Sequence, residues 1–387
     1  SGVVSVSFTT AKTTPYVKTA PVLSGTYGNT VSAMLKKADK TKAVVTAGRN
    51  SDTKVGGTWT LAPEDADKLP TVGTSEKYTL VFTPTGSDAD TYDSVTCEVT
   101  PEVSKKQITL VIADKEKFYG ETKLALAWSL ASGDAYPDNV LVADDTEEAL
   151  GISLSTTAKD NSDVGTYAIT GTSDSANYEV SFIGNGSDGK SGILTVKKAA
   201  SPNIGDEEKS YTYAAGSDGK AISVDIAGKL PTDRGTTAYA LTNTYNEQLL
   251  SDVAVDQDGN LTYKVNEADK SHVGDTTTIT VFASMENYNV ARYVLTIKIT
   301  DKKLVTLKSG NTVSVNGSNA LTYGDKLSKL GFSKVTFVEA DTDTKVKGTL
   351  EWADPDCIPT VGMTQAGWVF KPADSKHYEE LTGTAAI

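Results

Sequence analysis

The stretch VGTYAITGTSDSANY, residues Val164–Tyr178, carries the pattern that decides the fold. A Val-Gly pair opens it, polar and apolar residues then alternate as in a β-strand, and a turn of small residues leads to a tyrosine. Related stretches run over 72–92, 273–288 and 361–378. Because a pattern that recurs along a chain marks a repeated structural unit, the sequence predicts a tandem array of one kind of small β module.

Each part of the repeated pattern has an architectural role. We expect the glycine after each valine to adopt a positive φ where a loop enters a central strand. We expect the tyrosine ring to pack on the core while its hydroxyl reaches a neighbouring loop. The residues concerned are Gly73, Gly165, Gly274 and Gly362, and Tyr92, Tyr178, Tyr288 and Tyr378.

Lysine pairs mark the expected boundaries between modules. They are Lys105-Lys106, Lys197-Lys198 and Lys302-Lys303, and each adjoins a run typical of a strand. The predicted modules are therefore 1–104, 105–199, 200–301 and 302–387. The first and last are the most similar pair, since DTKVGGTWTL at 52–61 is answered by DTKVKGTLEW at 343–352.

Local signals predict mainly β structure with one short helix. Val31, Met34 and Leu35 recur at helical spacing after Asn29 or Thr30, either of which can cap a helix. Asp258-Gly259, between two alternating runs, predicts a hairpin. The other runs with strand alternation are 3–8, 57–61, 78–84, 92–99, 108–113, 192–196, 276–283, 293–299 and 304–307.

The predicted fold is therefore a tandem array of four small antiparallel β modules, each resembling a β-sandwich or a β-grasp. Placed in line, four such modules give an elongated rod on the order of 130–150 Å.

Composition excludes several classes of function. The 387 residues carry a formal net charge of −13, which disfavours nucleic acid and anionic membrane surfaces as partners. No apolar run approaches the length that crosses a bilayer, so we expect no membrane insertion in this segment. The chain lacks an initiating Met and a signal peptide, so we expect a piece of a longer protein.

Several residues that could carry chemistry have simpler structural explanations. His272 and His377 lie in different modules, so a shared catalytic or metal site is not expected. Asp256–Asn260 begins like a calcium loop but lacks the bidentate glutamate, and a hairpin turn explains it better. Two acidic clusters, one of Asp88, Asp90 and Asp93 and one of Asp354 and Asp356, remain open as weak calcium sites.

Other residues are expected to be structural as well. The four tryptophans lie in runs with strand alternation, which favours the core over an exposed sugar platform; they are Trp59, Trp128, Trp352 and Trp368. Cys97 and Cys357 fall in different modules and predict neither a disulfide nor a zinc site. No motif places a lysine and an asparagine beside an acid for an isopeptide crosslink. No catalytic, cofactor-binding or metal-binding residue is assigned, and no cofactor is expected.

The second module resembles the MBG domain of the YGX type, which occurs in arrays on large bacterial surface proteins. The matching residues are Phe118-Tyr119-Gly120, Val164–Ile169, Asn177-Tyr178 and Gly192–Val196. The longer segment SFIGNGSDGKSG before the last strand departs from that pattern. The first and fourth modules are similar to a related repeat of Firmicutes surface proteins, and the third to another repeat of the same proteins.

These observations predict a non-enzymatic stalk or adhesin segment of a Gram-positive cell-surface protein, extracellular and monomeric. The alternative is a binding module for a host glycan or glycoprotein, such as mucin or immunoglobulin, or for a polysaccharide. An enzyme is not expected, because the sequence offers no nucleophile–base pair.

Overall fold

The computed structural model describes residues 11–122, 124–242, 244–316 and 321–387. These residues form two compact units, which divide between Lys197 and Lys198, one of the lysine pairs. The predicted strand at 3–8 lies outside the described residues. Below, the four predicted ranges are called the first to fourth segments.

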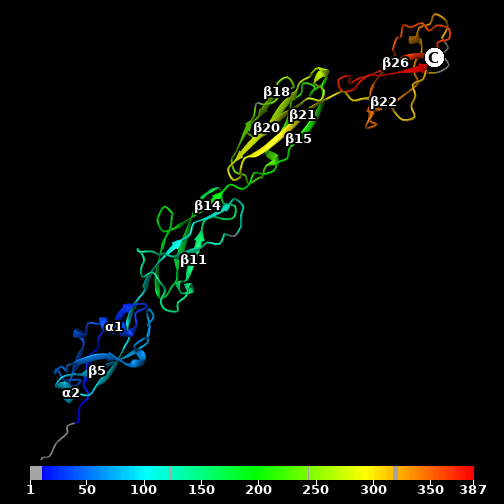
Figure 1. The fold of residues 1–387 in the computed structure, drawn as a ribbon. Coiled ribbons are helices and arrows are strands. Elements are labelled where there is room, and N and C mark those ends of the chain that lie inside the picture. Colours follow the sequence, from blue (N-terminus) through cyan, green and yellow to red (C-terminus); the bar gives the residue numbers. More distant parts are fainter. Residues whose placement is uncertain (1–10, 123, 243, 317–320) are drawn as a thin grey trace, which may run out of the picture. The chain divides into compact units, whose positions relative to one another are not determined.

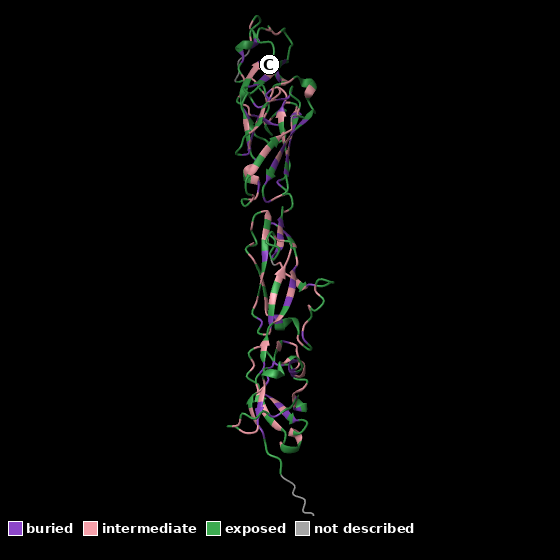
Figure 2. Cartoon of the chain, turned by 90° about the vertical axis from the view of Figure 1, so that its left-hand side faces the viewer, coloured by how far each residue is buried: buried purple, intermediate pink, exposed green. Residues whose placement is uncertain are grey.

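The chain is mainly β, with 41% of residues in strands and 8% in helices, arranged in many small sheets, as the sequence predicted. Figure 1 shows the strands β15, β20 and β21 lying side by side along the length of the third segment. Figure 2 shows buried and exposed residues alternating along many of these strands. This alternation is the period of two that placed the strands in the sequence.

The first segment contains the two α-helices of the described chain. Its strands are β1 (Tyr16–Thr19), β2 (Ser24–Thr26), β3 (Val44–Thr46), β4 (Gly57–Leu61), β5 (Tyr78–Pro84), β6 (Val95–Val99) and β7 (Glu102–Ser104), and its helices are α1 (Val31–Lys37) and α2 (Asp88–Thr91), with 3-10 turns at Lys40–Lys42 and Pro63–Asp65. The sheets are β1-β3, β4-β5-β6 and β2-β7. The predicted helix is confirmed as α1, and Thr30 is its cap, since its hydroxyl oxygen accepts a hydrogen bond from the Ala33 N–H at 3.2 Å.

The second segment has two sheets, β10-β8-β13 and β11-β12-β14-β9. Its strands are β8 (Lys106–Ile112), β9 (Lys115–Phe118), β10 (Trp128–Leu130), β11 (Ile152–Thr156), β12 (Gly165–Ser173), β13 (Tyr178–Ile183) and β14 (Gly192–Lys197), with a 3-10 helix at Glu147–Leu150. The sequence pattern that decides the fold is therefore strand β12, the turn after it, and the first residue of β13.

The third segment is also built from two sheets, β15-β21-β20-β17 and β16-β19-β18. Its strands are β15 (Glu207–Thr212), β16 (Ile222–Asp225), β17 (Thr237–Leu241), β18 (Leu250–Val255), β19 (Asn260–Val265), β20 (Thr276–Met285) and β21 (Ala291–Thr300), with 3-10 turns at Ala227–Lys229 and Lys270–His272. The predicted hairpin is confirmed, because β18 and β19 pair antiparallel across Asp258-Gly259.

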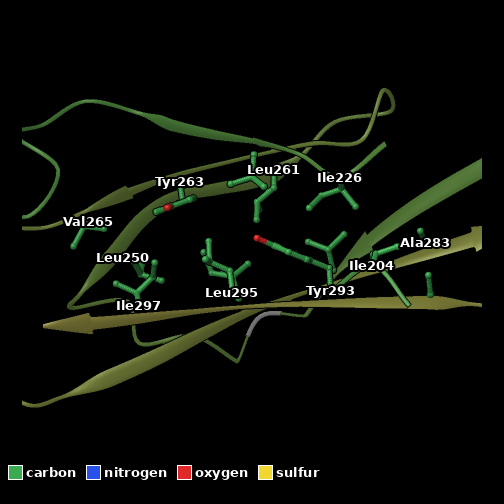
Figure 3. Packing of buried hydrophobic residues seen from close by; sticks show 14 of the residues in the cluster. Ile204, Ile226, Leu250, Leu261, Tyr263, Val265, Ala283, Tyr293, Leu295 and Ile297 are labelled. Atoms are coloured by element: carbon green, nitrogen blue, oxygen red, sulfur yellow. The ribbon is translucent and has the colours of Figure 1, made fainter. Parts of the chain in front are cut away.

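The core of the third segment fills the space between its two sheets. In Figure 3 the side chain of Tyr293 extends from β21 towards Leu261, on the facing sheet. Tyr263, Tyr293 and Leu261 are fully buried, and each large buried ring removes roughly 150–250 Å² from water. This core holds two sheets together without any contribution from another segment.

The fourth segment has the sheets β22-β23-β24 and β25-β26-β27. Its strands are β22 (Val305–Leu307), β23 (Phe337–Glu339), β24 (Lys345–Val346), β25 (Gly348–Trp352), β26 (Gln365–Pro372) and β27 (Leu381–Ala386), with a 3-10 turn at Leu327–Lys329. The order β25-β26-β27 repeats the order β4-β5-β6 of the first segment, as the sequence similarity between 52–61 and 343–352 predicted.

Parallel strand pairs are the main departure from the predicted antiparallel modules. Most pairs are antiparallel, but β2 with β7, β8 with β13, β9 with β14, and β15 with β21 are parallel. In each case an early strand of a segment pairs with a late one, after the chain has crossed between sheets. Parallel neighbours require such a crossover, and sequence alternation does not reveal it.

The glycines of the Val-Gly pairs follow the expectation in three of four places. Gly73, Gly274 and Gly362 have φ of 71°, 99° and 95°. The expectation is wrong for Gly165, which has no positive φ because it already belongs to β12 and pairs with Val196 of β14.

Candidate functional site: tyrosine turns and segment junctions

The four repeated tyrosines occupy equivalent places, and we call each one with its preceding residue a tyrosine turn. In every case the carbonyl of that preceding residue accepts a backbone N–H from the stretch of chain that leads into the same segment. The donor and acceptor pairs are Thr13 and Thr91 at 3.0 Å, Lys106 and Asn177 at 3.0 Å, Ala199 and Asn287 at 2.9 Å, and Lys303 and His377 at 2.8 Å. The turn therefore fixes where the chain enters a segment.

In three segments the tyrosine hydroxyl donates to a carboxylate. Tyr178 donates to Asp145 Oδ2 at 2.5 Å. Tyr288 donates to Asp233 Oδ1 at 3.0 Å, and Tyr378 to Glu339 Oε1 at 2.6 Å. The expectation that the hydroxyl reaches a neighbouring loop is thus confirmed for these three. The acids were not predicted, because they lie 33, 55 and 39 residues before their tyrosines, with no fixed spacing.

The lysine pairs reinforce the same turns. Lys105 Nζ donates to the carbonyl of Ser175 at 2.7 Å, and Lys198 Nζ donates to the carbonyl of Met285 at 2.6 Å. Each acceptor lies three residues before the tyrosine of its turn. The lysines therefore bind the turn of the segment that follows each predicted boundary.

A second repeated contact marks where the chain leaves a segment. The backbone N–H groups of Tyr27, Tyr119 and Tyr213 donate to the carbonyls of Ser104, Lys197 and Thr300, at 2.9, 2.8 and 3.0 Å. Each acceptor ends the last strand of its segment, namely β7, β14 or β21. Each tyrosine follows the early strand that pairs with that last strand in parallel.

At the junction of the first and second segments, an exit tyrosine contacts a tyrosine turn. The rings of Tyr27 and Tyr178 pack edge to face, with centroids 5.4 Å apart and planes at 84°. Both hydroxyls donate to the same oxygen, Asp145 Oδ2, at 3.0 and 2.5 Å. Burial and then the nearby Asp145 raise the pKa of both tyrosines, so both hydroxyls stay protonated as donors.

Two further contacts close this junction. The N–H of Val72, in the first Val-Gly pair, donates to Asn177 Oδ1 at 3.1 Å. Gly28 lies so close to Val142 that a Cβ there would stand 2.7 Å from a Val142 methyl carbon. Motif residues of the first segment thus contact motif residues of the second, and the junction is apolar at its centre and hydrogen-bonded around it.

The junction of the third and fourth segments relies on exposed charges instead. Lys270 Nζ lies 3.0 Å from an Asp301 carboxylate oxygen and 3.7 Å from one of Glu379. Lys376 forms an ion pair with Glu267. The one neutral side-chain hydrogen bond runs from the Thr212 hydroxyl to the carbonyl of Lys376 at 3.2 Å, within the part of the chain that the structure describes.

Both histidines bind an aspartate three residues away. His272 Nδ1 lies 2.9 Å from Asp275 Oδ2, and His377 Nδ1 lies 2.9 Å from Asp374 Oδ1. Each pair closes a local turn, so these contacts do not join the two histidines in one site.

Acidic residues of the calcium-like stretch and of both acidic clusters likewise have partners within their own segments. Asp256 Oδ1 accepts the N–H groups of Asp258 and Asn260 at 3.0 and 2.8 Å, which makes a hairpin turn of the calcium-like stretch. The hydrogen bonds from Asn260 hold the pKa of Asp256 below its usual value. Asp88 accepts the Gly56 N–H at 2.6 Å, and Asp356 pairs with Lys326 at 2.8 Å. Across residues 11–387, outside the gaps named above, no three His, Cys, Asp or Glu side chains converge as metal ligands.

Three of the four tryptophans are buried, as predicted: Trp59, Trp352 and Trp368. Trp128 is only half-buried in β10, so the core assignment is incomplete there. Cys97 and Cys357 are both free thiols, and burial raises the pKa of Cys97.

Two grooves open beside equivalent strands of the first and fourth segments. The larger, about 680 Å³, lies between β24, β25 and the 331–335 loop, where the Phe332 ring packs against Trp352 with centroids 4.4 Å apart and planes tilted by 37°. The smaller, about 390 Å³, lies beside Trp59 and Phe82. Both grooves are open, and their linings combine aromatic rings with polar groups and lysines.

Comparison with known proteins gives one family match. Residues 108–187 match the family described as MBG domain (YGX type), in agreement with the resemblance found in the sequence. No protein of curated function matches the chain. No helix among the described residues is long and apolar enough to span a membrane.

Among solved structures, the chain is similar to several fragments that contain more than one domain. The human desmocollin-1 ectodomain is 10% identical, with a TM-score of 0.23, over 97% of this chain and 79% of that one. Mouse cadherin-23 EC22-24 is 12% identical, with a TM-score of 0.24, over 75% and 100%. A three-domain fragment of titin is 12% identical, with a TM-score of 0.27, over 76% and 100%.

Proposed function

We propose that the chain is a non-enzymatic, load-bearing segment of a bacterial cell-surface protein, a stalk or adhesin region built from four modules at 1–104, 105–199, 200–301 and 302–387. One observation carries the proposal: in each of the first three segments an early strand and the last strand pair in parallel, at the point where the chain leaves that segment. The MBG match at residues 108–187 agrees with an extracellular, cell-wall or cell-surface location.

The parallel pairs have a direct mechanical consequence. In the third segment β15 and β21 pair over six residues, from Glu207 opposite Leu295 to Thr212 opposite Thr300. Tension enters β15 at its N-terminal end and leaves β21 at its C-terminal end. Two parallel strands are then pulled in opposite directions along their length, so all their hydrogen bonds bear the load together. When two strands are instead pulled apart from one end, as at the open end of a hairpin, their hydrogen bonds break one after another and at lower force.

Force spectroscopy on the full chain, held by its ends, tests this proposal with a matched pair of variants. The Tyr213 N–H faces β21, and N–H groups alternate in direction along a strand, so the Lys209 N–H also faces β21 and that of Glu208 faces away. Lys209→Pro removes a loaded hydrogen bond and lowers the unfolding force of the third segment. Glu208→Pro, in the same edge strand, leaves that force close to the parent value. Equal forces in the two variants contradict the proposal.

The proposed length is tested separately. Four modules in line predict a maximum dimension on the order of 130–150 Å in small-angle scattering. A maximum below about 80 Å excludes a rod of four modules. A chain that stays monomeric in the same sample supports the proposed monomer.

A second function is favoured by the groove beside Phe332 and Trp352. Apolar rings with a charged rim suit a host glycan, a glycoprotein such as mucin or immunoglobulin, or a polysaccharide. The purified chain is screened on arrays of these ligands, together with Lys345→Glu and Lys347→Glu. Both lysines line the groove and are exposed, so the variants alter its rim and leave the core intact. Binding that both variants weaken supports this function, and binding that neither changes excludes the groove.

A further inference from the structure

The first and fourth segments share a Tyr-Gly motif with the same backbone geometry. Tyr27-Gly28 and Tyr323-Gly324 each place the glycine at φ 96°. A Val-Gly pair with a positive φ follows in both, at Val72-Gly73 and Val361-Gly362. The third segment differs here, since Ala214 follows Tyr213.

In the first segment this motif is covered by the second segment. Tyr27 is only 9% exposed, its ring packs on Tyr178, and its hydroxyl donates to Asp145. The N–H of Val72 donates to Asn177, and Gly28 contacts Val142.

In the fourth segment the same positions are uncovered. Tyr323 is 85% exposed and Val361 is 93% exposed. A Cβ added at Gly324 would meet no heavy atom within 4 Å, in contrast to Gly28. Between the two residues lies an open apolar hollow of about 340 Å³, lined also by Met363 and Ile387. An exposed tyrosine and valine beside such a hollow form the kind of patch that another protein surface covers.

We propose that this end face of the fourth segment, formed by Tyr323, Val361, Met363 and Ile387, docks another β module that carries a tyrosine turn and an acidic loop like those of the second segment. The partner's aspartate accepts the Tyr323 hydroxyl, its asparagine side chain accepts the Val361 N–H, and its tyrosine ring packs on Tyr323. The proposal depends on the match between a covered and an uncovered copy of one surface. It is independent of whether the chain bears load.

The partner is specified by what the first junction uses. Asp145, Asn177 and Tyr178 come from two loops of one module, so a lone strand or a free peptide does not present them together. The second segment of another copy of this chain is already covered by its own Tyr27 and Val72. The partner is therefore a module whose turn is free, joined to the chain or separate from it.

The test appends residues 102–199 after Ile387 of the full chain. The addition starts at Glu102 because β7 begins there, and β7 pairs with β2, the strand that leads to Tyr27. Hydroxyl-radical footprinting by mass spectrometry then measures the oxidation rate of Tyr323. We expect a fall of about tenfold, which is the ratio between the 85% exposure of Tyr323 and the 9% exposure of Tyr27.

Two controls make the result decisive. The same chain with Asp145→Ala and Asn177→Ala in the appended copy alone should regain most of the parent oxidation rate at Tyr323. Circular dichroism during thermal unfolding shows that the appended copy is folded in both proteins. An unchanged Tyr323 rate with a folded addition overturns the proposal.

A different occupant would show in the parent chain. If Tyr323 of the unextended chain becomes protected as its concentration rises, with dimers seen by sedimentation, the face binds a second copy of this chain. That outcome also overturns the stated partner. A rate that does not depend on concentration supports it.

Discussion

A single carboxylate oxygen, Asp145 Oδ2, holds two tyrosines from different segments. Hydrogen bonds to a charged acceptor contribute about 1.5–3 kcal/mol each, and a buried donor left without one costs a similar amount. Because Tyr27 and Tyr178 share this acceptor, the effects of changing them are coupled. The stability of the junction is thus concentrated in very few atoms.

We predict that Tyr27→Phe lowers the free energy of unfolding of the first unit by about 1–2 kcal/mol, since the ring contact remains and one hydroxyl bond is lost. Asp145→Ala costs more, because it leaves two buried hydroxyls without this acceptor. Urea unfolding of both single variants and of the double variant gives the coupling energy, which we expect to be about 0.5–3 kcal/mol. Tyr323→Phe, at the exposed equivalent position, is the control and should change nothing. A double variant whose loss equals the sum of the single losses contradicts the shared role of Asp145.

The carboxylate of Glu339 should make the folding stability of the second unit depend on pH in the acid range. Hydrogen bonds from Thr342, Tyr378 and Lys303 lower its pKa from the ordinary 4.5 to about 2. The charged form is therefore favoured by folding, and the stability it contributes is complete above about pH 4.5 and lost as the pH falls towards about 2. We expect Glu339→Gln to be less stable than the parent at pH 7 and to approach it between pH 4.5 and 2. Urea midpoints across this range measure the gap, and a gap that stays constant with pH excludes Glu339 as its source.

Two strands depend on a glycine that faces a phenylalanine. A Cβ at Gly57 in β4 would lie 2.4 Å from the Phe82 ring and 2.5 Å from the Thr83 carbonyl oxygen. At Gly348 in β25 the matching distances are 2.5 Å to Phe370 and 2.4 Å to the Lys371 carbonyl oxygen. Both strands begin with a Gly-Thr pair, and the glycine is required there because the neighbouring strand leaves no space for a side chain.

We predict that Gly57→Ala and Gly348→Ala each destabilise their segment by about 1–3 kcal/mol, because the backbone of the neighbouring strand must move. Gly165→Ala is the matched control. It is also a strand glycine without a positive φ, but no heavy atom would lie within 4 Å of its Cβ. Thermal unfolding of the three variants compares them directly. If Gly165→Ala is as harmful as the other two, close approach is not the reason for the glycine.

The elements that the sequence predicts correctly are those whose signal is local. Spacing within one turn of helix placed α1, and the Asp258-Gly259 turn placed the β18–β19 hairpin. The parallel pairing of β15 with β21 was missed because it joins residues 88 apart, Glu207 and Leu295. The acid at Tyr178 was missed for the same reason, although the acidic loop 144–148 that supplies it stands out in the sequence. Repetition shows that a tyrosine has a structural role, but it does not identify its partner.

The two junctions stabilise their units in different ways, and this should govern how the whole chain unfolds. The first junction is buried at its centre, with Tyr27 9% exposed and Tyr178 1% exposed. The junction of the third and fourth segments depends on charges such as that of Lys270, whose side chain is 62% exposed. Exposed ion pairs contribute little and weaken as salt rises, whereas buried contacts are screened much less.

We therefore predict that salt uncouples the fourth segment from the third but leaves the first and second coupled. The Debye length falls from about 30 Å at 0.01 M to about 3 Å at 1 M, so the attractions of Lys270 for Glu379 and of Lys376 for Glu267 fade over this range. Calorimetry of the full chain should show the fourth segment, with its smaller core, melting earlier and separately at high salt. Lys270→Gln with Lys376→Gln should produce the same separation at low salt, and Tyr27→Phe should not. If the first and second segments uncouple with salt as readily as the third and fourth, the proposed difference between the junctions is wrong. Salt screens the buried hydrogen bonds to Asp145 much less than it screens exposed ion pairs.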